Sequence, residues 1–247
     1  MEYSRWTRRY MGWVQTLSYV LNMFKKITEK YRRAFAHPHF VRSFFVSSGL
    51  VLISLVINYF AAQYAVDRAS GAVADIVLSN IPVFDVDYIF VFGPIIFGIW
   101  VAFLCFSNPE TLPFTLKSIA IFVIVRSGFI TLTHIGPFPD HAVIDGGSAI
   151  LLHALSNNPN FFLFSTGADL FFSGHTGLPF MMALVFWKHH LTRIFCIATS
   201  IFFGIIVLLG HLHYSIDVAA AFFITYTIYI ITIKIFRKEH EEFLSVM

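Results

Sequence analysis

Charged side chains are scarce in this sequence: Asp, Glu, Lys and Arg together make up 13% of its 247 residues, against about 25% in soluble domains. Hydrophobic residues account for 57% of the chain and aromatic residues for 18%, and the mean hydropathy is +0.73. This balance excludes an ordinary soluble domain and indicates an integral membrane protein. The net charge of +3 is distributed unevenly and gives no indication of a nucleic-acid partner.

Cysteine is scarce as well. Cys105 and Cys196 both lie within apolar runs, so we expect them to be packing residues and not a disulfide. No cleavable signal peptide is expected, because the first 40 residues are basic and aromatic and have no short apolar core before a small-residue cleavage site. The sequence also contains no internal repeat and no low-complexity segment, which is typical of a single membrane domain.

Six apolar runs are long enough, or nearly long enough, to cross a membrane, which takes about 20 residues per helix. They cover residues 41–63, 88–106, 114–133, 173–187, 194–212 and 214–236, and the fourth is the shortest. The sequence therefore predicts an all-α polytopic membrane protein with six transmembrane helices in one bundle over residues 41–236. Residues 1–40 are either an amphipathic helix on the inner surface or a solvated basic tail, and residues 237–247 are expected to be a cytosolic tail.

Lysine and arginine are concentrated at the two ends of the chain. Residues 1–42 carry nine of them, and Lys234, Arg237 and Lys238 lie near the C-terminus. The side of the membrane opposite to the termini carries Arg68 together with these aspartates: Asp67, Asp75, Asp85, Asp87, Asp140, Asp145 and Asp169. Because cytosolic loops are enriched in Lys and Arg, both termini are predicted to be cytosolic and the connection 134–172 to lie on the other side.

Ionisable residues at membrane depth are functional candidates by default, because they are costly to bury there. The predicted topology places His175 in the first turn of the fourth helix, and it places His213 and Asp217 where the sixth helix begins. Arg126 lies seven residues from the outer end of the third helix, which corresponds to a depth of about 10 Å. We therefore expect these four residues to meet at the non-cytosolic boundary of one bundle.

This set of residues suits phosphoryl chemistry. His213 and Asp217 are four apart and share one helical face, so the carboxylate can orient the imidazole and leave its other nitrogen free as a nucleophile. His175 provides a second imidazole for acid–base catalysis, and Arg126 offers a planar fork of donors to an anionic oxygen. Ser173 and Gly174 open a helix whose N-terminus favours an anion, such as a phosphate.

Two other kinds of enzyme fit less well. The run from His211 to Asp217 resembles a set of metal ligands, and His189-His190 would extend it toward a histidine-rich desaturase. The topology places that pair at the other end of the fourth helix, about 21 Å from His175, so we expect no metal. A rhomboid-type protease would need a glycine two residues before Ser173, where this chain has Phe171.

Two motifs resemble those of the sphingomyelin synthase family, a branch of the type 2 phosphatidic acid phosphatase superfamily. Residues 169–176 are similar to the motif Asp-x-x-x-Ser-Gly-His-Thr, and residues 213–218 are similar to His-Tyr-Thr-x-Asp-Val. Weaker matches are Arg126 with Thr133 to an Arg-x6-Thr element, and residues 82–85 to Pro-Leu-Pro-Asp. The sequence departs from the family at Phe114, Val123 and 167–168, which leaves the headgroup and the acceptor open.

The resemblance implies that His213 is the nucleophile, that Asp217 orients it, and that His175 protonates the leaving oxygen. Asp169, His211 and Thr133 are the remaining candidates for supporting roles. The resemblance implies no cofactor. The partners are a phospholipid donor, a lipid or water acceptor and the bilayer, and the oligomeric state is open.

The choice between a phosphodiester and a phosphomonoester depends on cations. The phosphatase branch carries Lys-x6-Arg-Pro, which is absent here, and Ser-Arg before the last histidine, where this chain has Ile206-Val207. With Arg126 as the evident intramembrane cation, a singly charged diester fits better than a monoester of nearly two charges. A lipid phosphate phosphatase and a catalytically silent lipid-binding or transport protein are the alternatives.

Overall fold

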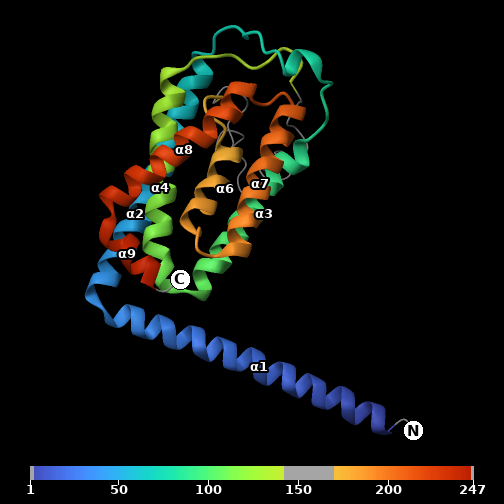
Figure 1. Cartoon of the computed structure of the whole chain (residues 1–247), viewed down its shortest axis with the longest axis vertical. Coiled ribbons are helices and arrows are strands. Elements are labelled where there is room, and N and C mark those ends of the chain that lie inside the picture. The colour runs from blue at the N-terminus through green and yellow to red at the C-terminus, as the bar shows by residue number, and fades with distance from the viewer. Residues whose placement is uncertain (1–2, 142–169, 246–247) are drawn as a thin grey trace.

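The computed structural model describes residues 3–141 and 170–245, and every regular element within these ranges is a helix (Figure 1). In chain order the elements are α1 (Tyr3–Ala36), α2 (Pro38–Asp67), the 3₁₀ helix η1 (Leu78–Asn80), α3 (Asp87–Ser107), the 3₁₀ helix η2 (Pro109–Thr111), α4 (Leu112–Leu132), α6 (Gly174–Val185), α7 (His190–Leu209), α8 (Ser215–Ile235) and α9 (Arg237–Ser245).

Five helical stretches in the described residues are long and apolar enough to cross a membrane: Pro38–Asp67, Asp87–Ser107, Pro109–Leu132, His190–Leu209 and Ser215–Ile235. They correspond to five of the six expected spans, and the prediction of an all-α polytopic membrane protein is confirmed. The fourth expected span forms α6, which has only 12 residues and is therefore about 18 Å long. A hydrocarbon core is about 30 Å thick, so α6 is too short to cross it as a helix by itself.

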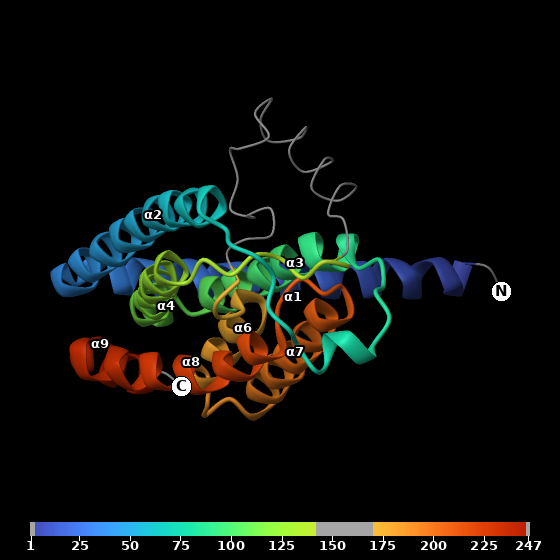
Figure 2. The ribbon, with the colours of Figure 1, turned by 90° about the horizontal axis from the view of Figure 1, so that it is seen from above.

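The short helix α6 is enclosed by its neighbours. It packs against α4, α7 and α8 (Figure 2), and Met181 and Ala183 are fully buried. Small residues permit this close packing. A Cβ atom added to Gly177 would lie 2.8 Å from the Phe122 ring of α4 and 2.9 Å from the Thr225 hydroxyl of α8. The N-terminus of α6 is therefore held in a fixed position inside the bundle.

One end of the bundle, here called the loop end, consists of residues 68–86, 133–141 and 210–214. The backbone N–H of Ser70 donates to the carbonyl of His134 at 2.7 Å. The buried hydroxyl of Tyr214 donates to the carbonyl of Gly136 at 2.9 Å and accepts from the N–H of Val73 at 3.1 Å. Tyr214 thus joins the start of α8 to two separate connecting segments.

The opposite end, here called the terminal end, consists of the α1–α2 junction, η2 and α9. Residues 237–245, expected as a tail, form a docked helix whose Phe243 is fully buried. The buried ammonium of Lys117 donates to the Ser43 hydroxyl at 3.0 Å and forms an ion pair with Glu239 of α9. Burial raises the pKa of the Glu239 carboxyl, but Lys117 outweighs this effect and holds that pKa below its usual value.

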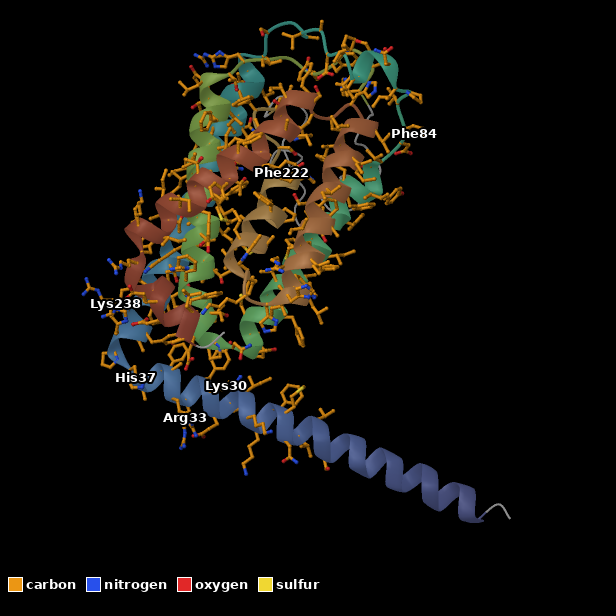
Figure 3. The ribbon with its side chains drawn as sticks, in the orientation of Figure 1. Lys30, Arg33, His37, Phe84, Phe222 and Lys238 are labelled. Carbon is orange, nitrogen blue, oxygen red and sulfur yellow. The ribbon has the colours of Figure 1, made fainter. Side chains whose placement is uncertain are left out.

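Helix α1 extends beyond the rest of the molecule, across the terminal end (Figures 1 and 3). It is anchored where the Lys30 ammonium donates to the Asn108 side chain at 2.6 Å. Leu21 and Phe24 are more than half exposed on this helix, beside exposed lysines and arginines. The N-terminal segment is thus helical over residues 3–36, and its position on a membrane surface stays a prediction.

We expect Lys117→Met to destabilise the protein by about 3–5 kcal/mol, because it leaves the Glu239 carboxylate without its buried partner. Thermal unfolding of the purified protein in detergent measures the change. The double variant Lys117→Met/Glu239→Leu removes both charges and should recover most of the loss, whereas Lys26→Met alters only an exposed lysine and is the control. Wild-type stability of Lys117→Met would show that the pair does not hold α9.

Candidate active site

His175 lies in the first turn of α6, where Ser173 is the N-cap residue. The Ser173 hydroxyl accepts from the backbone N–H of Thr176 at 3.4 Å, as an N-cap side chain does. Ser173 is fully buried and shapes the helix start, and its contact with a phosphate stays a prediction. The N–H groups of Gly174 and His175 occupy the first helical positions, which have no intrahelical acceptor and favour an anion.

His213 precedes Tyr214, the N-cap residue of α8, and is 5% exposed. Its Nδ1 lies 2.8 Å from the carbonyl oxygen of Leu170. Because a carbonyl can only accept, Nδ1 carries the hydrogen and Nε2 of the neutral ring keeps a free lone pair. The tautomer that a nucleophilic Nε2 requires is thus fixed by the backbone.

Asp217 was predicted to orient His213. Its Oδ2 atom lies 3.5 Å from His213 Nδ1 and 2.9 Å from the backbone N–H of Tyr214, which donates to it within a capping box. The Leu170 carbonyl is the nearer partner of the imidazole. Asp217 therefore caps α8 and places a fully buried carboxyl group beside the His213 ring. The Leu170 carbonyl forms the shorter contact that holds this ring.

A backbone hydrogen bond brings the two histidine motifs together. The N–H of Ser173 donates to the carbonyl of Asp217 at 3.2 Å. Together with the bond from His213 to Leu170, it joins residues 170–173 to residues 213–217. The start of α6 and the start of α8 are therefore side by side at the loop end, as the predicted topology required.

Arg126 extends from α4 to this junction. Its Nε donates to the carbonyl of Phe172 at 3.0 Å, and the side chain is 9% exposed. A Cβ atom on Gly174 would lie 3.2 Å from Arg126 Nε, so the absence of a side chain at Gly174 gives the guanidinium room. Arg126 thus lies against the N-terminus of α6, where an anion would be bound.

The partner of His175 was not predicted. Its Nε2 lies 3.0 Å from the carbonyl of Phe90 on α3, and its ring stacks on the Phe90 ring at a centroid distance of 4.1 Å. Since the acceptor is again a carbonyl, Nε2 carries a hydrogen, and Nδ1 is the nitrogen that can gain or lose a proton. Phe90 belongs to an ordinary apolar run, so nothing in the sequence singles it out.

The supporting candidates are not all brought to this site. The Thr133 hydroxyl donates to the Phe129 carbonyl of its own helix at 2.9 Å, two turns from Arg126. His211 is buried beside the Phe138 ring with a φ of 51°, and neither of its ring nitrogens has a hydrogen-bond partner among the described residues. Asp169 lies outside the described residues. In residues 82–85, the Asp85 carboxylate accepts from the backbone N–H of Asp87 at 3.1 Å.

Asp75 has a structural role at the start of α8 that the sequence pattern did not predict. Its Oδ2 accepts from the backbone N–H of Ser215 at 2.7 Å, and its Oδ1 accepts from Val77 and Leu78. Burial raises the pKa of this carboxyl, but the hydrogen bonds, led by that of Ser215, outweigh burial and hold the pKa below its usual value. Asp75 therefore caps α8 in its ionised form, and this contribution is lost only as the pH falls through the depressed pKa.

Within the described residues, no group of three or more His, Cys, Asp or Glu side chains is arranged so that it could hold a metal ion. His189 and His190 lie beyond the end of α6 opposite to His175 and are exposed. The donor set of a histidine-rich desaturase is therefore not assembled by these residues.

His175, His213 and Asp217 lie within a segment that matches a known family, whereas Arg126 lies outside it. Residues 166–234 match the family model described as PAP2 superfamily C-terminal. The match covers α6, α7 and nearly all of α8, and it supports the type 2 phosphatidic acid phosphatase superfamily, whose members are lipid phosphatases and phosphotransferases. Searches of curated proteins and of solved structures found no match. The sphingomyelin synthase-like branch is not distinguished by this match.

We expect Asp217→Asn to lower the turnover of a lipid phosphate ester by about tenfold or more with little change in melting temperature. The amide oxygen can still accept from Tyr214, but the negative charge beside His213 is lost. Asp217→Ala is the companion variant, because it also removes the cap and should cost about 1 kcal/mol of stability. Equal destabilisation by both substitutions would assign the carboxylate to the helix cap alone.

Arg126→Lys should reduce the same rate by about tenfold or more although it keeps the charge, because lysine has no Nε donor and no planar fork. Steady-state turnover measures the loss. Arg68→Lys is the control, since Arg68 stacks on Tyr64 at the end of α2 and has no predicted role in the site. If Arg126→Lys turned over as fast as the wild type, the guanidinium would be a structural group only.

Proposed function

We propose that the protein transfers or releases the phosphoalcohol headgroup of a phospholipid through a phosphohistidine intermediate. The proposal depends on two imidazoles beside one helix N-terminus that use opposite ring nitrogens for their hydrogen bonds to the backbone. His213 has Nδ1 held by a carbonyl and Nε2 free, whereas His175 has Nε2 held by a carbonyl and Nδ1 free. Such a pair suits a double displacement, because one ring attacks phosphorus and the other moves a proton.

In the first step, His213 Nε2 attacks phosphorus and a P–N bond forms. The bond from phosphorus to the diacylglycerol oxygen breaks, and that oxygen takes a proton from Nδ1 of protonated His175. Arg126 and the free N–H groups of α6 stabilise the negative charge on the other phosphoryl oxygens. The imidazolium that develops on His213 is stabilised by the adjacent Asp217 carboxyl group.

In the second step, an acceptor hydroxyl gives its proton to Nδ1 of His175 and attacks phosphorus. The P–N bond breaks, His213 regains its lone pair, and His175 is again protonated for the next cycle. With a lipid alcohol as acceptor the reaction is a headgroup transfer, and with water it is a phospholipase-C-like release. Both outcomes use the same two histidines in the same roles.

The distribution of cations favours a phosphodiester substrate. Lys117 lies at the terminal end in its ion pair with Glu239, and Arg68 stacks on Tyr64 at the end of α2. Arg126 is thus the cation placed against the start of α6. One cation and a helix N-terminus match the single charge of a diester better than the nearly double charge of a monoester.

The loop end is proposed to face away from the cytosol. Lys30, Arg33 and Lys238 lie at the terminal end (Figure 3), as the distribution of Lys and Arg along the sequence also indicates. The loop end instead carries Asp75, Asp85 and other aspartates. The positive-inside rule then places the active site at the non-cytosolic side, in a bacterial inner membrane or a eukaryotic membrane.

A second candidate function is a lipid phosphate phosphatase that releases inorganic phosphate from phosphatidic acid. The matched family model favours it, because the superfamily includes phosphatases that act on lipid phosphates. The same histidines would act, with water as the acceptor. A catalytically silent lipid-binding protein is the alternative from another class.

Purified protein in lipid nanodiscs, supplied with labelled phosphatidylcholine, phosphatidylethanolamine, phosphatidylglycerol or phosphatidic acid, separates these functions. We expect diacylglycerol plus a phosphoalcohol, or a lipid with a new headgroup, from at least one diester. Inorganic phosphate from phosphatidic acid alone would favour the phosphatase. No turnover of any lipid would favour the silent binding protein.

His213→Ala provides the mechanistic control for that assay. It should lower turnover by at least about 10³-fold per folded molecule, as removal of a nucleophile does in other enzymes. The fraction of folded protein is measured alongside, because the substitution also removes the buried bond to the Leu170 carbonyl. His190→Ala removes an exposed imidazole at the terminal end and should leave the rate unchanged. Turnover by His213→Ala near the wild-type level would rule out the phosphohistidine.

A further inference from the structure

An apolar groove of about 430 Å³ lies between α1, α2, α3, α4 and α6, toward the terminal end of the bundle. Aliphatic and aromatic side chains form most of its wall, including Phe97 and Phe106 of α3, Leu178 and Met182 of α6, and Tyr31 of α1. The hydroxyl of Thr115, which also lines the groove, donates to the Thr111 carbonyl of its own helix at 2.8 Å. The lining thus suits an apolar ligand.

Two helices that line the groove also carry residues of the candidate active site. On α6, Leu178 and Met182 follow His175 by three and seven residues, so all three side chains share one face. On α3, Phe97 follows Phe90 by seven residues and shares its face in the same way. Since His175 and Phe90 stack on each other, both helices lead from this pair into the groove.

The groove lies in the half of the bundle nearer the terminal end. Phe97 and Phe106 lie about 15 and 29 Å from the start of α3 at the loop end, so along α3 the groove extends from the middle of a hydrocarbon core about 30 Å thick toward its terminal-end face. Helix α1 closes the far end, where the rings of Tyr31 and Phe106 are 5.4 Å apart. The hydrogen bond from Lys30 to Asn108 holds α1 in this position.

One side of the groove is open. Gly98 is exposed, and a Cβ atom built on it would meet no other atom within 4 Å. By contrast, a Cβ atom on Gly93, one turn and a half earlier on α3, would lie 2.6 Å from the Phe203 ring. A chain from the surrounding bilayer can therefore enter beside Gly98, where α3 is not covered by protein.

We propose that this groove binds one acyl chain of the lipid whose phosphate group lies between His175 and His213. The proposal rests on the proposed function for the position of the phosphate, but binding of the chain does not require turnover. A headgroup at the loop end and a chain that points toward the terminal end is the orientation of a lipid in the non-cytosolic leaflet. Tyr31 and Phe106 then set an upper limit to the length of chain that the groove accepts.

A photoreactive lipid tests whether the groove binds an acyl chain, and this test does not require turnover. Full-length protein in nanodiscs is irradiated with phosphatidylcholine, and separately with phosphatidic acid, that carries a diazirine at the end of one palmitoyl chain. We expect labelled peptides from the Phe106 end of α3 and from α1 near Tyr31. Labelling confined to lipid-facing positions of other helices would overturn the proposal.

Gly98→Phe should remove most of that labelling, because the added ring occupies the space in the close-packed groove that the chain needs. Gly128→Phe is the matched control, since Gly128 is also an exposed helical glycine with nothing within 4 Å, but on α4 outside the groove. Ala102→Phe, one turn beyond Gly98 in the groove lining, serves as a second variant where Gly98→Phe fails to fold. Equal labelling of the wild type and both groove variants would exclude the groove as the binding site.

Chain-length selectivity is the second arm. For whichever lipid is turned over, Gly98→Phe should lower kcat/KM for the dipalmitoyl form severalfold more than for the dioctanoyl form, because the shorter chains need less of the groove and lose less of the remote binding energy. Equal losses for both forms would overturn the proposal while leaving the headgroup chemistry intact. If no lipid is turned over, the proposed function fails and the labelling result alone decides whether the groove binds a chain.

Discussion

Two hydrogen bonds join the segment before α6 to the start of α8: one from the Ser173 N–H to the Asp217 carbonyl, and one from His213 Nδ1 to the Leu170 carbonyl. Both are buried, where hydrogen bonds are electrostatically stronger and an unpaired donor costs about 1–3 kcal/mol. Through them the N-terminus of α6, His175 and His213 share one location. The approach of Arg126 to Gly174 then adds a cation to the same place.

Much of this arrangement could be predicted from the sequence, because it follows from where apolar runs end. The scarcity of charge predicted a membrane protein, and the uneven distribution of Lys and Arg brought His175, His213, Asp217 and Arg126 to one end of the bundle. Asp217 lies in the first turn of a helix as predicted, whereas His213 precedes the N-cap residue Tyr214, so the two side chains meet without sharing a helical face. These features depend on local patterns and on the thickness of a bilayer, which a single sequence contains.

The remaining features depend on contacts between distant backbone groups, which no pattern of side chains encodes. The carbonyls of Leu170 and Phe90 hold the two imidazoles, yet any apolar residue at either position would present the same oxygen. The length of α6 was also overestimated, because Phe186 and Trp187 continue the apolar run although the helix ends at Val185. From the sequence, Asp75 was counted only as one of the negative charges of a loop. Its contact with Ser215 could not be predicted, because the two residues are 140 positions apart in the sequence.

The bond between His213 and Leu170 also bears on how the protein can change by mutation. A point mutation can delete a side chain that orients a catalytic imidazole, but it cannot delete a main-chain carbonyl. The tautomer of His213 is therefore insensitive to substitution at its own hydrogen-bond acceptor. Sensitivity is transferred to residues that set the path of the chain between Leu170 and Gly174. Substitution of apolar residues there, which have no chemistry of their own, can therefore displace the proposed nucleophile.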